Sequence, residues 1–347
     1  MRKFILLCLL INLHLITYTQ VIKGTILDKQ TKKPIEYASV YFSGTFAGTT
    51  SDQNGKFELD ISKNPSMPLT ISFVGYYSYV LTDFSAGKPL FIYLTPKINE
   101  LNEVVISAES LARIRKEKLK LFKNEFLGLT TNAKNCEITN EDDIKFNYGN
   151  DGDTLKAFAS KPILINNKAL GYKITYYLDK FEYDKKSKTV IFVGNIIFTE
   201  DLTVDKTQKK VYEKKRINTF LGSRMHFFRS LWSNELQSNK FIVKNSNGQV
   251  LSYKNIVNKD SSNKAFLNFT ENLIIDYYSN LSAINFLKNE VFFDKNGYFD
   301  PTGINWIGEM AKQRVADLLP YEYTYGEESP VLGIPVSRDH FIEPVHK

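Results

Sequence analysis

The stretch "KGTILDKQTKKPIEYASVYFSGTFAGTTSDQNGKFELDI" (residues 23–61) decides how the first part of the chain folds. Short runs of alternating apolar and polar residues are separated by turn signals. The tetrapeptide "DQNG" (52–55) predicts a hairpin turn, because Asn and Gly tolerate a positive φ. The same pattern continues through "LTISFVGY" (69–76), "LFIYLTP" (90–96) and "EVVIS" (103–107). About seven short strands at this spacing are typical of a β-sandwich.

A set of spaced residues within 20–107 follows the pattern of a known family. They are Gly24, Pro34, Ala38, Val40, Gly48, Thr50, Asp52, Gly55, Phe57, Gly75, Tyr76 and the ending Leu101 to Ile106. With these residues the segment resembles the carboxypeptidase-like regulatory domain, also called the carboxypeptidase D regulatory-like domain. The resemblance implies a transthyretin-like (Ig-like) sandwich, common in exported proteins of Gram-negative bacteria. It also implies a non-catalytic accessory domain, without metal ligands or a nucleophile.

Residues 108–347 are predicted to form a mixed α+β, strand-rich domain of unknown function. The 14% aromatic content, with frequent Thr, Ile and Val, favours strands. The strings "FKNEFLG", "KPILINNKALGYKITYYLDKFEYD", "LGSRMHFFRSL" and "GINWIGEMAKQRVADLLPYEY" resemble the C-terminal half of uncharacterised secreted bacterial proteins that carry the same sandwich. No activity comes with that second resemblance.

Periodicity predicts the main elements of this second part. A basic amphipathic helix is expected at about 109–126, and two paired strands at 171–184 and 189–200, joined by a short turn. A helix capped by Ser223 is expected to follow, with a buried stripe of Phe228, Leu231 and Trp232. A last helix is expected from about Ile304 to Leu319.

The first twenty residues have the three parts of a secretory signal. Arg2 and Lys3 are followed by an apolar run from Phe4 to Ile16, which is shorter than the roughly 20 residues that span a bilayer. The sequence therefore predicts a signal peptide at 1–19 and cleavage before Gln20, with no transmembrane helix in the mature chain. Cleavage lowers the formal net charge from +7 to +5, because Arg2 and Lys3 leave with the signal. This mild charge, dispersed along the chain, predicts no nucleic-acid partner.

The C-terminal stretch "HFIEPVH" (340–346) raises the hypothesis of a zinc site, because His and Glu ligate zinc in carboxypeptidases. Pro344 disfavours a helix that would bring His340, Glu343 and His346 onto one face. In an extended chain Glu343 points away from the two histidines. Neither geometry gives three converging ligands, so no metal site is predicted.

The remaining candidate sites each have a plain structural interpretation. "NDGDT" (150–154) offers oxygens to calcium, but it lacks the spaced carboxylates of an EF-hand and reads as a turn. Cys136 and His226 form a hypothetical nucleophile and base, although a buried structural cysteine is the default. Arg224, His226 and Arg229 could line an anion pocket, but packing and solvation explain them more simply.

The sequence holds no recognisable catalytic motif, so no catalytic, cofactor-binding or metal-binding residue and no cofactor is predicted. We interpret the chain as a non-enzymatic exported binding or scaffold protein of the bacterial cell envelope, periplasmic or associated with the outer membrane. Its expected partner is an envelope protein or a glycan. The alternative is a secreted hydrolase with a site dispersed in residues 108–347. Converging carboxylates or histidines in a deep pocket would favour the hydrolase, and an exposed groove or edge strand would favour binding.

Overall fold

A computed structural model describes residues 20–64, 66–97, 108–149, 152–200, 205–261 and 264–325. By its internal packing the chain divides into two compact units. The first comprises Met1–Phe42 and Gly48–Pro96, and the second comprises Ser43–Ala47 and Lys97–Lys347. The predicted signal peptide (1–19), the predicted strand at 103–107, and His340, Glu343 and His346 lie outside the described residues.

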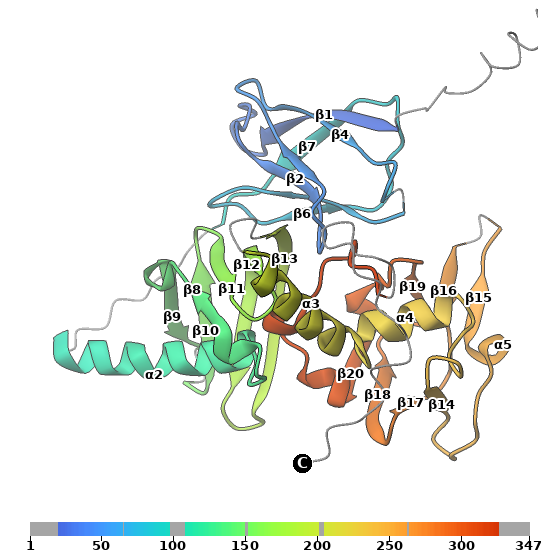
Figure 1. Cartoon of the computed structure of the whole chain (residues 1–347). Helices are drawn as coiled ribbons and strands as arrows, with labels where there is room; N and C mark the ends of the chain where they lie inside the picture. Colours follow the sequence, from blue (N-terminus) through green and yellow to red (C-terminus); the bar gives the residue numbers. More distant parts are fainter. Residues whose placement is uncertain are drawn as a thin grey trace, which may run out of the picture. The chain divides into compact units, whose positions relative to one another are not determined.

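The first unit is all-β, which confirms the predicted fold class of this part (Figure 1). One sheet has the order β4-β1-β7 and the other β3-β2-β5-β6. Strand β1 is antiparallel to β4 and parallel to β7. The strands are β1 (Val21–Asp28), β2 (Ser39–Phe42), β3 (Gly48–Thr50), β4 (Lys56–Asp60), β5 (Leu69–Ser72), β6 (Tyr79–Leu81) and β7 (Leu90–Leu94).

The hairpin turn at 52–55 has the predicted chemistry. Gly55 has φ 72°. The Asp52 carboxylate accepts hydrogen bonds from the backbone N–H groups of Asn54 and Lys56, both at 2.8 Å. Phe57 and Leu59 of β4 are buried, as their alternation with polar residues requires. Local turn chemistry and a period of two thus set this part of the sandwich.

The second unit begins with a six-stranded sheet in the order β8-β11-β12-β10-β9, with β13 paired to β12. Tyr172, Ile174, Tyr176 and Leu178 of β12 are all buried on one face, as predicted. The elements are α2 (Ala108–Phe126), β8 (Cys136–Ile138), β9 (Ile144–Tyr148), β10 (Thr154–Ala159), β11 (Ile163–Asn167), β12 (Tyr172–Asp184) and β13 (Thr189–Glu200), with 3₁₀ turns at Ala133–Asn135 and Glu141–Asp143.

Helix α2 confirms the helix predicted from its apolar spacing and packs on this sheet (Figure 1). Phe122 and Phe126 are fully buried. Their rings lie 4.7 Å from Phe181 and 4.8 Å from Tyr176, respectively, between centroids. Arg113, Lys116 and Lys120 are exposed, so much of the basic run is the solvated side of a packed helix. Arg115 instead donates hydrogen bonds to the carbonyls of Ile144 and Glu141, at 2.9 and 2.8 Å.

The rest of the second unit forms a second core around α4 and two sheets, in the orders β14-β17-β18-β20 and β15-β16-β19. Ser223 caps α4 as predicted, because its hydroxyl accepts a hydrogen bond from the His226 N–H at 3.0 Å. The elements are α3 (Lys206–Phe220), α4 (Arg224–Trp232), β14 (Phe241–Lys244), α5 (Tyr253–Ile256), β15 (Val257–Lys259), β16 (Ala265–Leu267), β17 (Leu273–Tyr277), β18 (Asn280–Phe286), β19 (Val291–Phe293) and β20 (Ile304–Gly308).

The predicted last helix at about 304–319 is wrong. Residues Ile304–Gly308 form strand β20, antiparallel to β18, with Trp306 opposite Ile284. Gly308, at φ 79°, ends the strand, and 3₁₀ turns follow at Glu309–Lys312 and Val315–Asp317, after one at Pro301–Gly303. Residues 304–308 form a strand because β18 provides hydrogen-bond partners for their backbone N–H and C=O groups. The spacing of apolar residues within the segment cannot reveal this distant partner.

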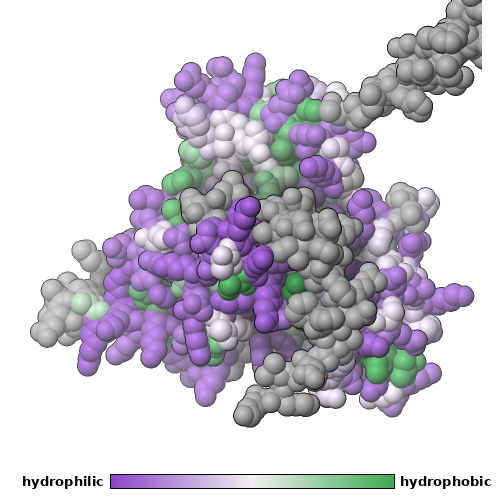
Figure 2. Space-filling view, in the orientation of Figure 1, coloured by the Kyte–Doolittle hydropathy of each residue, from purple (hydrophilic) through white to green (hydrophobic). Residues whose placement is uncertain are grey.

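The surface of the second unit in the view of Figure 2 is mostly hydrophilic, with hydrophobic residues in small separate patches. Scattered exposed apolar residues are ordinary on globular proteins and need no special explanation. Within the described residues, no helix combines the length and the apolar character needed to cross a membrane.

Candidate functional site

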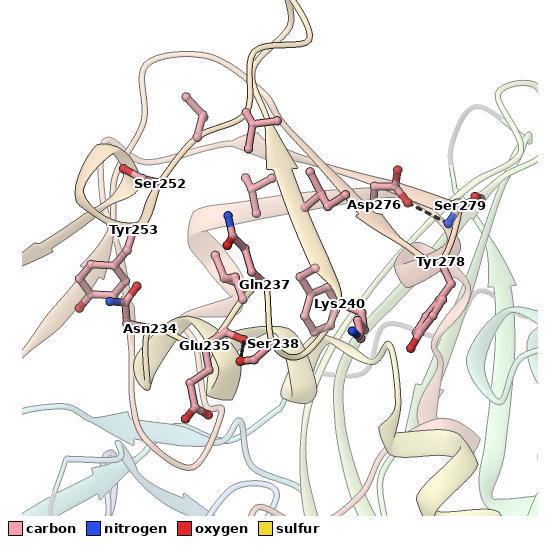
Figure 3. Close-up of a pocket in the computed structure, with 16 residues that line it drawn as sticks. Asn234, Glu235, Gln237, Ser238, Lys240, Ser252, Tyr253, Asp276, Tyr278 and Ser279 are labelled. Carbon is pink, nitrogen blue, oxygen red and sulfur yellow. Dashed lines mark hydrogen bonds between the residues drawn. The ribbon is translucent and has the colours of Figure 1, made fainter. Parts of the chain in front are cut away.

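An open groove of about 1020 Å³ lies over strand β14 in the second unit (Figure 3). Phe241 and Val243 of this strand point into the core and are buried, so Ile242 between them points outward. Ile242 is 42% exposed and Val250, which also lines the groove, is 55% exposed. These two side chains give the groove an apolar floor that no described residue covers.

The rim of the groove comes from three separate segments. Residues 234–240 connect α4 to β14, Ser252 and Tyr253 begin α5, and residues 276–279 include the turn between β17 and β18. Figure 3 places Tyr253 with Asn234 on one side of the groove, Tyr278 with Lys240 on the other, and Gln237 between them. The site is thus assembled from segments that are up to 45 residues apart in sequence.

Several polar side chains on the rim are uncommitted. The side-chain amides of Asn234 and Gln237 and the ammonium group of Lys240 have no hydrogen-bond or ion-pair partner among the described residues. All three side chains are exposed. An amide offers donors and an acceptor together, so these groups are available to a polar ligand.

The backbone of the groove is strained where its polar residues stand. Seven described residues other than glycine have positive φ, and four of them line the groove: Asn234, Lys240, Tyr278 and Ser279. Such conformations cost of order 1–3 kcal/mol each and concentrate at functional sites. This concentration in one groove distinguishes it from the other surfaces of the second unit.

The two carboxylates of the groove do not form a catalytic pair. Glu235 accepts a hydrogen bond from the Ser233 hydroxyl at 3.1 Å. Asp276 accepts one from the Ser279 N–H at 2.9 Å and lies 3.9 Å from the Lys244 ammonium. Figure 3 shows the two carboxylates in different parts of the groove. The arrangement therefore suits binding better than acid–base chemistry, which needs both groups directed at one bond.

The arginines that the sequence analysis weighed as an anion pocket bind backbone carbonyls instead. Arg229 donates hydrogen bonds to the carbonyls of Asn296, Tyr323 and Tyr321, at 2.9, 2.6 and 3.0 Å. Arg224 donates to the carbonyls of Met310 and Gln313, at 2.9 and 3.2 Å. Burial lowers the pKa of Arg224 to about 10, so it stays charged at neutral pH. These guanidinium groups hold the irregular segment that follows β20, and Arg229 also holds the turn at Asn296 between β19 and β20.

Cys136 and His226 are not a nucleophile and its base. Burial and the nearby carboxylate of Asp317 raise the pKa of the Cys136 thiol to about 12, the opposite of an activated thiol. Burial lowers the pKa of His226 to about 4, and its Nδ1 accepts a hydrogen bond from the Gly222 N–H at 3.1 Å. Among the described residues no hydrogen bond joins the two side chains, and the His226 ring packs between Phe220 and Phe241.

No metal centre is assembled in the part of the chain that the structure describes, where no three His, Cys, Asp or Glu residues cluster suitably. Of the stretch 150–154, Asn150 and Asp151 lie outside the described residues. Asp153 in the same stretch forms an ion pair with Lys186 at 2.6 Å.

Sequence reasoning missed the groove because its lining comes from distant segments with no shared motif. The one local signal was turn chemistry. "YS" at 278–279 joins two strands by a two-residue turn, where Asn-Gly is the usual choice. Tyr278 and Ser279 hold positive φ there, 49° and 65°, without the residues that adopt it most easily.

Comparisons with known proteins add little about the second unit. No curated protein matches the chain. A Bacteroides uniformis protein proposed to bind carbohydrate shares 11% identity, with 52% of this chain and 79% of that chain covered and a TM-score of 0.19. A Bacteroides fragilis protein of unknown function, proposed to be membrane-associated, shares 12% identity, with 83% and 94% covered and a TM-score of 0.17. A 9R-lipoxygenase from Cyanothece shares 12% identity, with 61% and 48% covered and a TM-score of 0.17.

The family comparison concerns the first unit. The model of the CarboxypepD_reg-like domain matches residues 22–106, nearly the whole range that the sequence resemblance covers. The seven described strands of this range are those of an all-β domain. Residues 22–106 of this chain therefore form a CarboxypepD_reg-like domain.

Proposed function

We propose that the protein is an exported, non-enzymatic binding protein of the bacterial cell envelope, and that the groove over β14 holds its ligand. The observation that carries the proposal is the groove itself. It combines an uncovered apolar floor, Ile242 and Val250, with the uncommitted amides of Asn234 and Gln237. Clefts of this size with an apolar floor and a few polar groups are the usual form of ligand sites.

The two parts of the chain have different proposed roles. Residues 20–107 act as the accessory domain that the CarboxypepD_reg-like match implies. Residues 108–347 carry the ligand site, since every residue that lines the groove lies there. The rival hydrolase would need converging reactive groups, whereas the two groove carboxylates are engaged separately and Cys136 and His226 are held in unreactive states. These features support binding over hydrolysis.

Export is the first part of the proposal to test. The mature chain is expected to begin at Gln20 and to be found outside the cytoplasmic membrane, because residues 1–19 have the charged, apolar and cleavage regions of a secretory signal. Cell fractionation followed by mass spectrometry of the amino-terminal peptide measures this. Recovery of an intact Met1 peptide from the exported protein would contradict it.

Binding through the groove is the second part. Wild-type protein is expected to co-sediment with isolated cell envelopes, and the double variant Ile242→Lys with Val250→Lys to bind about tenfold less tightly, a loss near 1.4 kcal/mol. Two ammonium groups on the apolar floor would have to be desolvated when the ligand binds.

The matched control is Ile191→Lys. Ile191 lies on β13 and is 56% exposed, so this variant adds the same charge to an equally open strand position outside the groove. It should bind envelopes like the wild type. Equal binding by the double variant would remove the groove from the function. Release of new reducing ends or amines from the envelopes would favour the hydrolase.

A further inference from the structure

We infer that the ligand of the groove is an oligosaccharide, one of whose sugar rings stacks on the exposed ring of Tyr278. This inference rests on the proposed function, because it names the chemistry of the ligand that the groove would hold. Three features carry it: the turn that displays Tyr278, the support behind its ring, and the uncharged character of the free polar groups.

The turn between β17 and β18 displays Tyr278 against the preference of the backbone. Tyr277 pairs with Asn280, so Tyr278 and Ser279 form a two-residue turn, and their φ angles are 49° and 65°. Positive φ at both positions is the type I′ geometry that Asn-Gly adopts most easily. Tyr278 is nevertheless 46% exposed, so burial does not explain its place there. Contact between the exposed Tyr278 ring and the ligand would explain why this residue occupies a strained turn.

A stack of aromatic rings holds Tyr278 in position. Its ring meets that of Tyr277 edge-on, at 5.0 Å between centroids and an interplanar angle of 90°. Tyr277 in turn packs 4.7 Å from Phe241 and 5.8 Å from His226, both buried. The Tyr277 ring is thus fixed against the core, and it supports the Tyr278 ring from behind. A pre-positioned tyrosine gives a flat contact at low entropic cost, which suits the C–H face of a sugar.

The free polar groups complement a neutral, hydroxyl-rich ligand. Of the charged side chains in the groove, Glu235 and Asp276 already have partners, which leaves Lys240 as the free charge. The remaining uncommitted groups are uncharged: the exposed amides of Asn234 and Gln237, and the hydroxyls of Tyr253, Tyr278 and Ser279. Sugar hydroxyls donate and accept as amides do, so each can pair fully with the other. A strongly charged ligand would leave most of these groups unused.

The test is titration of the mature full-length protein with linear tetrasaccharides of glucose, N-acetylglucosamine, mannose, xylose and galactose, followed by calorimetry. At least one is expected to bind. Tyr278→Ala should weaken that binding about tenfold or more, and Tyr278→Phe should keep it within about threefold, because the ring face is retained. Tyr79→Ala, at a tyrosine of the first unit that is 42% exposed, is the matched control and should change nothing.

A second variant separates ligand contact from a structural role. Tyr278→Asn combined with Ser279→Gly places the preferred residues in the turn, so the melting temperature should rise by about 2–4 °C while sugar binding is lost. A merely structural tyrosine would show loss of stability together with loss of binding. Undiminished sugar binding by this variant or by Tyr278→Ala would overturn the inference.

The remaining outcomes distinguish this inference from the proposed function. If no tetrasaccharide binds, while co-sedimentation with envelopes still depends on Ile242 and Val250, the groove holds a peptide or another component and the sugar assignment fails alone. If neither tetrasaccharides nor envelopes bind, both proposals fail.

Discussion

Replacing Gly55 by valine is expected to lower the free energy of unfolding by about 2–4 kcal/mol, from local strain and a disturbed ladder. Gly55 has φ 72°, and a Cβ there would lie 2.5 Å from the Ile26 carbonyl oxygen and 3.2 Å from Cβ of Pro34. The neighbouring chain cannot simply move away. Ile26 donates to the Gly55 carbonyl at 2.8 Å and accepts from the Ile35 N–H at 3.0 Å.

Gly87→Val is the matched control for this prediction. Gly87 also has positive φ, 87°, but a Cβ there would meet nothing within 4 Å. It therefore reports the conformational strain without the collision, about 1–2 kcal/mol. Urea denaturation of both variants measures the difference. Equal losses would show that the contact with β1 does not matter.

The same experiment tests the proposed domain boundary. The fragment 20–107 is expected to fold alone, because about 88 residues suffice for an independent core. Gly55→Val should then destabilise the fragment by the same amount as the whole protein. A fragment that stays unfolded would contradict a separate domain at 20–107.

Arg229→Met is expected to cost about 3–5 kcal/mol, because three carbonyls lose a charged donor at once. Methionine keeps the aliphatic stem and removes every N–H group, so the carbonyls of Asn296, Tyr321 and Tyr323 lose their shared partner. The guanidinium also lies 5.4 Å from the ring centroid of Phe220. The irregular segment after β20 would lose one of its main attachments to α4. Thermal and urea unfolding measure the loss.

Two further variants identify the cause. Arg229→Lys keeps the charge, but a single ammonium cannot replace three N–H groups of a planar fork, so most of the loss should remain. Arg113→Ala removes an exposed arginine of α2 and should change stability by no more than about 0.5 kcal/mol. A fully stable Arg229→Lys variant would show that charge alone matters at this position.

The sequence by itself determined those helices, strands and turns that depend on residues close together in the chain. The turn at 52–55 and the alternation of β4 needed only Asn-Gly chemistry and a period of two. Helix α2 and the capped helix α4 followed from apolar spacing and from Ser223. Strands β12 and β13 form one antiparallel hairpin, so their pairing partner was also their neighbour in sequence.

Helix α3 shows where local signals become too weak. Its buried residues, Tyr212, Ile217 and Phe220, are sparse among lysines and do not form a clear helical stripe. The side chain of Asp205 caps the helix through the Gln208 N–H at 2.8 Å. Contacts with the rest of the unit supply what its own pattern lacks, as is common for helices in proteins.

Only the tertiary structure decided the outcome where a residue's partner lies far away in sequence. Residues Ile304–Gly308 form a strand because β18 offers a ladder to pair with. Arg229 is structural because its carbonyl partners are 67 to 94 residues away. The groove exists because β14, the start of α5 and the turn at 278–279 meet in space. The energies that fix these features belong to long-range contacts, and no window of sequence contains both partners.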